Sequence, residues 1–422
     1  MKIFCLIFCM STSLCGLAQL KAPQSFTIAK SASEAGFSEQ RLKYLDKLMQ
    51  DFVKNGIAPN AATFIARNGK IVAFNTYGYS NVASKIPLKK DDIFRIASQT
   101  KAIATVGLLT LFEKGVFLLD DPISKYIPEF KNPKVLVSFD KASGKFETRL
   151  AKSEITIRQL LSHSSGISYD SPLQDRPEYS VPGLNSLKPD ILADIVKRLA
   201  ARPLQAEPGE KFIYGYNTDV IGYLIEILSS KKLDVFLKET VLDPLGMKDT
   251  YFYLPDNKAG RLVELYSKPS ATEPFTVSNN DDNRFYPIKG AKTYFSAGAG
   301  MESTIEDYAK LCQMIVNYGS FNNHTILGRK TVEMMALNQI GDSEVWDRKD
   351  KFGLGFQIIT TKSHYGDNAS PGSLTWGGAY CSEYTIDPKE KLILLVFTNV
   401  LPYAHYGEFV RKFRMGVYQA LE

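Results

Sequence analysis

The stretch FRIASQTKAI, residues 94–103, carries the pattern from which both the fold and the chemistry of this 422-residue chain can be argued. It places Ser98 and Lys101 three positions apart. On a helix, residues at i and i+3 lie on one face, so the lysine amine can reach the serine hydroxyl. A serine becomes a good nucleophile when a base takes its proton. The pair therefore predicts Ser98 as a nucleophile and Lys101 as its activating base.

The residues that follow favour this interpretation over a helix cap with a surface lysine. A helix is predicted over residues 98–115, and its side chains are apolar almost all round. Such a helix is buried and not amphipathic. A buried setting disfavours the ammonium form of a lysine, which is the condition under which its amine accepts a proton. Ser98, at the start of the helix, also lies near unpaired backbone N–H groups.

Strand patterns occur near both ends of the chain. Strands are predicted at 61–66 and 70–77, around an Asn68-Gly69 turn, and again at 384–386 and 392–398. Between them lie helix-like segments broken by loops that contain proline and glycine. The simplest assembly pairs the terminal strands in one antiparallel sheet, which predicts an α/β fold with a helical insertion.

The stretch around Ser98 resembles the nucleophile segment of the serine β-lactamase-like superfamily. This superfamily includes class C β-lactamases, D-alanyl-D-alanine carboxypeptidases and family VIII carboxylesterases. The resemblance covers nearly the whole mature chain in the family's order, and continues through LLSHSSGI at 160–167, PGE at 208–210, LDPLGM at 242–247 and GAGMEST at 298–304.

The resemblance implies a β-lactamase/transpeptidase-like fold, in which helices flank an antiparallel sheet built from the N- and C-terminal strands and a helical domain is inserted. The expected organisation of the chain is a signal peptide at 1–18, which the first residues indicate, followed by one catalytic unit at 19–422. Within that unit we expect an α/β part at 19–97 and 291–422, and a mostly helical insertion at 98–290.

The second element of the family is a tyrosine that acts as general base or acid, usually within Tyr-x-Asn. The corresponding stretch here is YGYNTDVIG, residues 214–222, which is similar to the Tyr-Ser-x-x-x-Asp-Val-x-Gly form of the esterase-like members. The resemblance assigns the catalytic role to Tyr214. Tyr216 stands where the asparagine is usual and is expected to line the substrate site, with Asn217 one residue off. The alternative for Tyr214 is a core tyrosine with a satisfied hydroxyl.

The third element is normally Lys-Thr-Gly on a strand beside the nucleophile. This chain has Trp376-Gly377-Gly378-Ala379 instead, as many of the esterases do. Paired glycines allow the backbone to approach a substrate closely. By resemblance, the N–H groups of Ala379 and Ser98 form an oxyanion hole. The alternative is a glycine turn beside a packed tryptophan.

Three further polar residues, His163, Arg95 and Asp219, are weaker candidates for a catalytic role. His163 lies among serines, but the chain has no Gly-x-Ser-x-Gly motif, and the resemblance makes this loop architectural. Arg95 and Asp219 are expected to be supporting or structural residues. The four histidines show no metal-ligand spacing, and the predicted chemistry uses no metal or organic cofactor.

The first residues predict a secretion signal. Lys2 precedes a mostly apolar stretch, and Gly16-Leu17-Ala18 offers small residues to a signal peptidase. The apolar stretch is shorter than the about 20 residues that span a bilayer. A lipoprotein signal through Cys15 is a weaker alternative, because its flanking residues depart from the usual pattern. We expect an exported protein, periplasmic or secreted, without stable membrane insertion.

Removal of the signal leaves Cys312 and Cys381, which are expected either as a disulfide or as two buried free thiols. The net charge of +6 is spread along the chain without a basic run, which argues against nucleic acid as a partner. The sequence does not indicate an oligomeric state.

These features predict a serine hydrolase that forms an acyl-enzyme on ester or amide carbonyls. Two groups that bind the carboxylates and amides of β-lactams and peptides are missing: the lysine of Lys-Thr-Gly and the asparagine of Tyr-x-Asn. The predicted substrates are therefore small acyl esters. A β-lactamase or D-alanyl peptidase is the alternative with the same chemistry. A non-catalytic binding or sensor protein is the alternative of another class.

Overall fold

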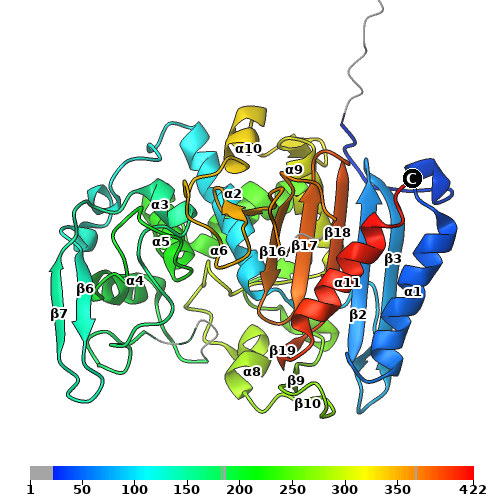
Figure 1. The fold of residues 1–422 in the computed structure, drawn as a ribbon, viewed down its shortest axis with the longest axis horizontal. Coiled ribbons are helices and arrows are strands. Elements are labelled where there is room, and N and C mark those ends of the chain that lie inside the picture. Colours follow the sequence, from blue (N-terminus) through cyan, green and yellow to red (C-terminus); the bar gives the residue numbers. More distant parts are fainter. Residues whose placement is uncertain (1–21, 182, 184–186, 366–367) are drawn as a thin grey trace, which may run out of the picture.

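The structure is organised around a nine-stranded sheet that joins the two ends of the chain (Figure 1). The computed structural model describes residues 22–181, 183, 187–365 and 368–422, so the predicted signal peptide at 1–18 lies outside the described residues. Strand β2 pairs antiparallel with β18, which confirms that the terminal strands share one sheet. In spatial order the strands are β1 (Thr27–Ile28), β3 (Lys70–Asn81), β2 (Asn60–Arg67), β18 (Leu392–Phe397), β17 (Ser382–Asp387), β16 (Leu374–Gly378), β15 (Gln357–Ile358) and β14 (Lys351–Phe352), and β4 (Ile86–Pro87) pairs with β3.

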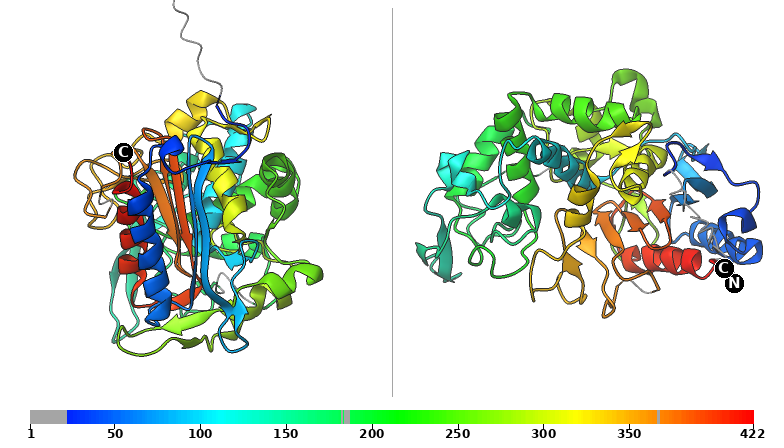
Figure 2. Two further views of the ribbon diagram at one scale, coloured as in Figure 1. Left: turned by 90° about the vertical axis from the view of Figure 1, so that its right-hand side faces the viewer. Right: turned by 90° about the horizontal axis from the view of Figure 1, so that it is seen from above.

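The central strands are buried because both faces of the sheet are covered, and β18, with the sequence LILLVF, is a continuous apolar run. Every residue of β17 and β18 is buried. Helices α1 (Glu39–Lys54) and α11 (Tyr406–Tyr418) lie side by side on one face (Figure 2). The rings of Phe52 on α1 and Phe409 on α11 meet edge-on at 5.1 Å. On the other face, α9 (Ile305–Val316) packs against β2, β17 and β18.

The hairpin between β2 and β3 turns where the sequence predicts it. Arg67 is the register partner of Lys70, and the two residues between them, Asn68 and Gly69, have φ of 52° and 75°. Both central residues of a type I′ turn need positive φ, which asparagine and glycine adopt at low energy. Strand β3 runs four residues further than predicted, to Asn81.

Helix α2 (Thr100–Glu113) lies at the centre of the molecule, between the sheet and the other helices (Figure 1). Its residues from Thr100 to Leu111 are all buried, as its all-round apolar sequence predicts. It packs against α5 and α6. The remaining α-helices are α3 (Ile157–Leu161), α4 (Leu192–Ala201), α5 (Asn217–Ser229), α6 (Leu233–Leu237), α7 (Asp243–Leu245), α8 (Asp281–Lys289) and α10 (Arg329–Met335).

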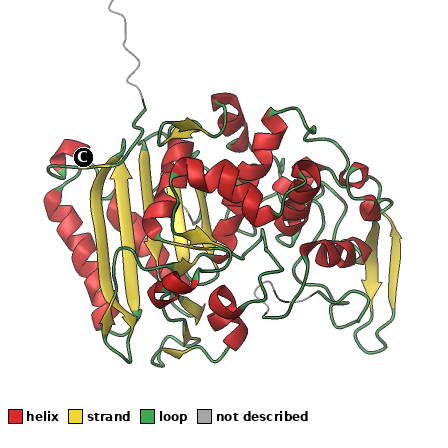
Figure 3. Cartoon of the chain, turned by 180° about the vertical axis from the view of Figure 1, so that it is seen from behind, coloured by secondary structure: helices red, strands yellow, loops and turns green. Residues whose placement is uncertain are grey.

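A β-hairpin that the sequence analysis did not predict stands at the end of the molecule away from the main sheet (Figure 3). It consists of β6 (Lys134–Phe139) and β7 (Phe146–Leu150). Small sheets elsewhere contain β5 (Phe94–Arg95), β8 (Thr250–Tyr251) and β11 (Glu302–Ser303), then β9 (Tyr266–Lys268), β10 (Thr276–Val277) and β19 (Val400–Tyr403), and finally β12 (Ser320–Phe321) with β13 (His324–Thr325).

Cys312 and Cys381 are buried free thiols. Burial raises the pKa of both thiols well above the ordinary value, so both remain protonated and unreactive near neutral pH. Among the residues described, none of the helices is both long and apolar enough to cross a bilayer.

Candidate active site

Ser98 lies at a sharp turn between β5 and α2. The chain leaves β5 and enters a short 3-10 turn, Ala97–Gln99, that runs directly into α2. Ala97 has a φ of 43°, a left-handed conformation that costs energy for a residue with a Cβ atom. This turn sets Ser98, which is half-buried, at the start of the helix and against β16.

The amino group of Lys101 lies 3.3 Å from Ser98 Oγ, so the structure brings together the pair predicted from the helical spacing. Lys101 is only 3% exposed. Its Nζ also donates to the carbonyl of Gly298 at 2.7 Å and to the hydroxyl of Tyr169 at 2.9 Å. Three acceptors thus hold the amine beside the serine hydroxyl, at a separation just above the range of about 2.6–3.2 Å in which a base takes a proton.

Gly298 is held in place by Asp219, a fully buried residue on α5. One carboxylate oxygen of Asp219 accepts hydrogen bonds from Tyr294 at 3.1 Å, Ser296 at 2.8 Å and the Gly298 N–H at 3.4 Å. A Cβ atom at position 298 would lie 2.4 Å from its other oxygen, which explains the glycine. Burial raises the pKa of Asp219, and the charge of Lys101 opposes that shift.

Tyr214 and Ser98 line one cavity. The amine of Lys101 lies 4.7 Å from the centre of its ring. The indole Nε1 of Trp376 donates a hydrogen bond to its hydroxyl oxygen at 3.3 Å. The hydroxyl oxygen of Tyr214 is thus held at a fixed place beside the Lys101 amine. The tyrosine and the tryptophan that the family resemblance singled out are therefore direct neighbours.

Tyr169 is a site residue that the sequence analysis did not identify. Its hydroxyl touches the Lys101 amine, and its ring packs edge-on against the ring of Tyr214 at 5.3 Å. Burial raises the pKa of Tyr169 well above its ordinary value, so the phenol stays protonated. It follows the LLSHSSGI stretch by two residues, but no local spacing relates it to Ser98, 71 positions earlier.

The two glycines of β16 allow the strand to lie directly against the segment that carries the serine. A Cβ atom on Gly378 would lie 2.2 Å from the backbone oxygen of Ile96, two residues before Ser98. One on Gly377 would meet the hydroxyl of Tyr406 at 2.1 Å. Ala379, the next residue, lines the cavity together with Ser98.

A cavity of about 230 Å³ opens beside Ser98, and its lining contains most of the predicted site residues. Five of its lining side chains are aromatic, which suits a small and partly apolar substrate. It is lined by Ser98, Tyr214, Trp346, Arg348, Gln357, Tyr365, Thr375, Trp376, Gly377, Gly378, Ala379, Glu383 and Tyr406.

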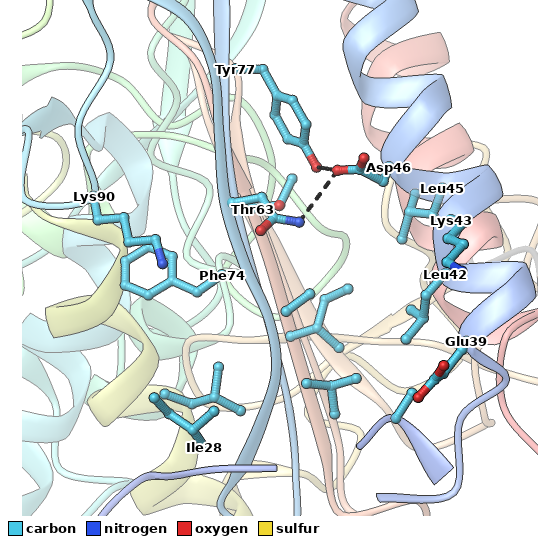
Figure 4. A pocket seen from close by; sticks show the side chains of 16 residues that line it. Ile28, Glu39, Leu42, Lys43, Leu45, Asp46, Thr63, Phe74, Tyr77 and Lys90 are labelled. Atoms are coloured by element: carbon cyan, nitrogen blue, oxygen red, sulfur yellow. Dashed lines mark hydrogen bonds between the residues drawn. The ribbon is translucent and has the colours of Figure 1, made fainter. Parts of the chain in front are cut away.

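A larger cavity of about 510 Å³ lies elsewhere, between α1 and the outer strands of the sheet (Figure 4). Its polar groups satisfy one another, because Asp46 accepts hydrogen bonds from Tyr77 at 2.7 Å and from Asn75 at 3.4 Å. It has no serine beside a lysine or tyrosine. The predicted nucleophile Ser98 and Tyr214 line the smaller cavity instead.

Tyr216, His163 and Asn217 do not line the cavity beside Ser98. The structure thus departs from the expectation that Tyr216 lines the substrate site: this residue is 8% exposed and packs edge-on against Tyr169 at 4.6 Å. His163 Nδ1 pairs with the side-chain amide of Asn217 at 3.0 Å. Burial, together with the charge of Lys101, lowers the pKa of His163 well below its ordinary value. Its ring is therefore neutral.

Arg95 is also buried and has a structural position. Its side chain donates to the backbone carbonyls of Val263, Asn283 and Arg284, and it ties these distant segments to β5. Within the described part of the chain, no group of three or more His, Cys, Asp or Glu residues is placed to hold a metal ion.

Comparison with known proteins agrees with this geometry. The model of the Beta-lactamase family matches residues 45–417. The chain therefore belongs to the beta-lactamase family. Esterase EstB of Burkholderia gladioli is 25% identical over 386 residues, which cover 89% of this chain and 94% of that protein. Monacolin J acid methylbutanoyltransferase of Aspergillus terreus is 30% identical over 340 residues, with 75% and 79% covered.

The fold agrees as well. A solved structure titled "EstCE1, a hydrolase with promiscuous acyltransferase activity" superposes with a TM-score of 0.76 at 24% identity, covering 90% of this chain and 99% of that one. The predicted superfamily and fold class are thereby confirmed. This member of the beta-lactamase family therefore has a fold that serine hydrolases and acyltransferases share.

Proposed function

We propose that this protein hydrolyses small acyl esters through an acyl-enzyme on Ser98. The observation that carries the proposal is the 3.3 Å contact between Lys101 Nζ and Ser98 Oγ, at the edge of a cavity that Tyr214 and Ala379 also line. The 25% identity to Esterase EstB supports the choice of esters.

The reaction begins when Ser98 Oγ attacks the ester carbonyl and its proton passes to Lys101 or Tyr214. The carbonyl oxygen becomes an oxyanion that accepts hydrogen bonds from the backbone N–H groups of Ser98 and Ala379. As the tetrahedral intermediate collapses, the C–O bond to the alcohol breaks, and Tyr214 or Lys101 returns the proton to the leaving oxygen. Water then attacks the acyl-enzyme and releases the acid and free Ser98.

Labelling with a fluorophosphonate, followed by mass spectrometry, tests the nucleophile. The expected result is one adduct on Ser98 and none in the Ser98→Ala variant. The matched control is Ser296→Ala, because Ser296 lies in the same region but donates to Asp219. Folded protein without an adduct on Ser98 would instead favour the non-catalytic binding protein.

Turnover of a short-chain aryl ester and of a cephalosporin tests the substrate class. The site has a tryptophan in place of the lysine of Lys-Thr-Gly, and therefore we expect ester hydrolysis with weak or absent cephalosporin turnover. Strong cephalosporin hydrolysis without esterase activity would reverse this order and favour the β-lactamase or peptidase alternative.

We also propose that the protein is exported after cleavage behind Ala18. Lys2, the apolar stretch after it and the small residues at 16–18 support this. N-terminal sequencing of protein from fractionated cells is expected to give Gln19 as the first residue outside the cytoplasm. An intact N-terminus in the cytoplasmic fraction would exclude export.

A further inference from the structure

The cavity beside Ser98 contains an arginine whose side chain is held between two aromatic rings. The guanidinium carbon of Arg348 lies 4.4 Å from the centre of the Trp346 ring and 4.0 Å from that of Tyr365. Its Nη1 donates to Gln357 Oε1 at 3.4 Å. All four residues line the cavity.

We propose that Arg348 binds a carboxylate of the substrate, so that the preferred substrates are esters that carry a second, anionic carboxyl group. This inference rests on the proposed esterase function and specifies its substrate class. A guanidinium that is stacked on aromatic rings keeps the edge with its N–H groups available. That planar edge matches the two oxygens of a carboxylate.

Arg348 forms no ion pair with a carboxylate among the residues that the structure describes. The nearby acidic group is Asp350, which accepts a hydrogen bond from Gln357; burial raises the pKa of Asp350 and the charge of Arg348 opposes that shift. Glu383, the acidic residue that lines the cavity, forms a buried ion pair with Arg414, in which the side chains are 7% and 1% exposed. Glu344 pairs with Lys349 at 2.9 Å. Arg348 thus brings to the aromatic wall of the cavity a guanidinium that is in no ion pair with a described carboxylate, and such a cation attracts an anionic ligand.

Trp346 connects this cation to the predicted catalytic residues. Its ring lies 6.0 Å from that of Tyr214 and stacks on Trp376 at 5.5 Å and 21°. Arg348 is therefore separated from Tyr214 by a single ring. A carboxylate bound there lies within the reach of a small molecule whose scissile carbonyl is at Ser98. Arg348 would then supply the anion recognition that is lost with the lysine of Lys-Thr-Gly.

The carboxylate can belong to the acyl part or to the alcohol part of the ester, and two pairs of probes distinguish these sources. For the acyl part, para-nitrophenyl hydrogen succinate is compared with its methyl ester. For the alcohol part, para-acetoxybenzoate is compared with its methyl ester. In each pair the probes differ only in the charge of the distal group. We expect the anionic member of at least one pair to have a kcat/KM higher by roughly tenfold to a hundredfold.

The variant Arg348→Gln is expected to bring that ratio close to one. Lys349→Gln is the matched control, because it removes the same charge one residue away, from a side chain that does not line the cavity. It should retain the ratio. Arg348→Lys, which keeps the charge without the planar edge, should give an intermediate ratio.

The possible results separate the two proposals. If the wild-type protein hydrolyses the methyl-capped esters but prefers neither anionic probe, the carboxylate proposal is wrong and the esterase function stands. A preference that survives in Arg348→Gln would also overturn the role of Arg348. If none of the four esters is hydrolysed, the esterase function itself fails, and the inference that rests on it fails too.

Discussion

The indole nitrogen of Trp376 donates a hydrogen bond to the hydroxyl oxygen of Tyr214 at 3.3 Å. By the family resemblance, Trp376 stands in place of the lysine of Lys-Thr-Gly, so that a neutral donor is expected where a cation is usual. The contact brings a hydrogen-bond donor to the tyrosine oxygen without adding a charge to the cavity. The proposed proton acceptor is thus assisted by the strand that also supplies Ala379.

Removal of this donor is expected to slow the reaction. Trp376→Phe keeps an aromatic ring but loses the N–H, and we expect kcat for an aryl ester to fall roughly tenfold, as for a hydrogen bond to a charged group. Steady-state kinetics measure the change. Trp346→Phe removes a similar ring that makes no hydrogen bond to Tyr214, and it should have a smaller effect on kcat. Equal losses in both variants would show that the bond itself does not matter.

Tyr169 is expected to position the amine of Lys101. In Tyr169→Phe the amine loses its 2.9 Å partner but keeps Gly298 and Ser98. We therefore expect kcat to fall about fivefold while KM changes little, since one neutral hydrogen bond is worth about 1 kcal/mol. Tyr216→Phe is the control, because the neighbouring Tyr216 does not bond to Lys101. A loss seen in KM alone would contradict a positioning role.

The pair of Ser98 and Lys101 could be predicted from the sequence because its geometry is local. Three residues on a helix fix the distance between the two side chains, and the apolar character of 98–115 indicates burial. Tyr214 and Trp376 reach the site from distant elements, and only the family resemblance identified them. Tyr169 had no such signal, because the loop that carries it is positioned by tertiary packing.

Exposure explains the hairpin that the sequence analysis did not predict. Strands β6 and β7 are largely exposed, so they lack the alternation of apolar and polar residues that marks a strand with one buried face.

For Tyr216 a sequence signal was present, but it suggested a different location from the one in the structure. Its position relative to Tyr214 suggested the substrate site, but it lies at the start of α5 and is covered by Tyr169.

Gly378→Ala is expected to be strongly destabilising and inactive. The added Cβ would lie 2.2 Å from the backbone oxygen of Ile96, and this backbone leads directly to Ser98. Overpacking of this kind costs about 1–3 kcal/mol. Urea denaturation and ester hydrolysis measure the two effects.

Gly377→Ala provides the matched comparison. Its Cβ would clash with the hydroxyl of Tyr406, the end of a side chain that can move, while the nearest backbone atom, the oxygen of Ser382, would lie 3.1 Å away. We expect a smaller loss of stability, which the double variant with Tyr406→Phe should restore in part because the hydroxyl is gone. Equal destabilisation by the two glycine variants would contradict the close contact between β16 and Ile96.

Glu302 is expected to make the stability of the protein decrease as the pH rises. The side chain is fully buried, and burial raises its pKa well above 4.5. The folded state therefore keeps the proton at pH values where the unfolded state releases it, so the free energy of unfolding falls with increasing pH above 4.5. For one group this slope is at most about 1.4 kcal/mol per pH unit.

Glu302→Gln cannot ionise, and its free energy of unfolding should decline less between about pH 5 and pH 7. Urea denaturation across this range tests the prediction, with the exposed Glu306→Gln as control. Parallel curves for the wild type and Glu302→Gln would mean that Glu302 does not hold a proton in the folded state.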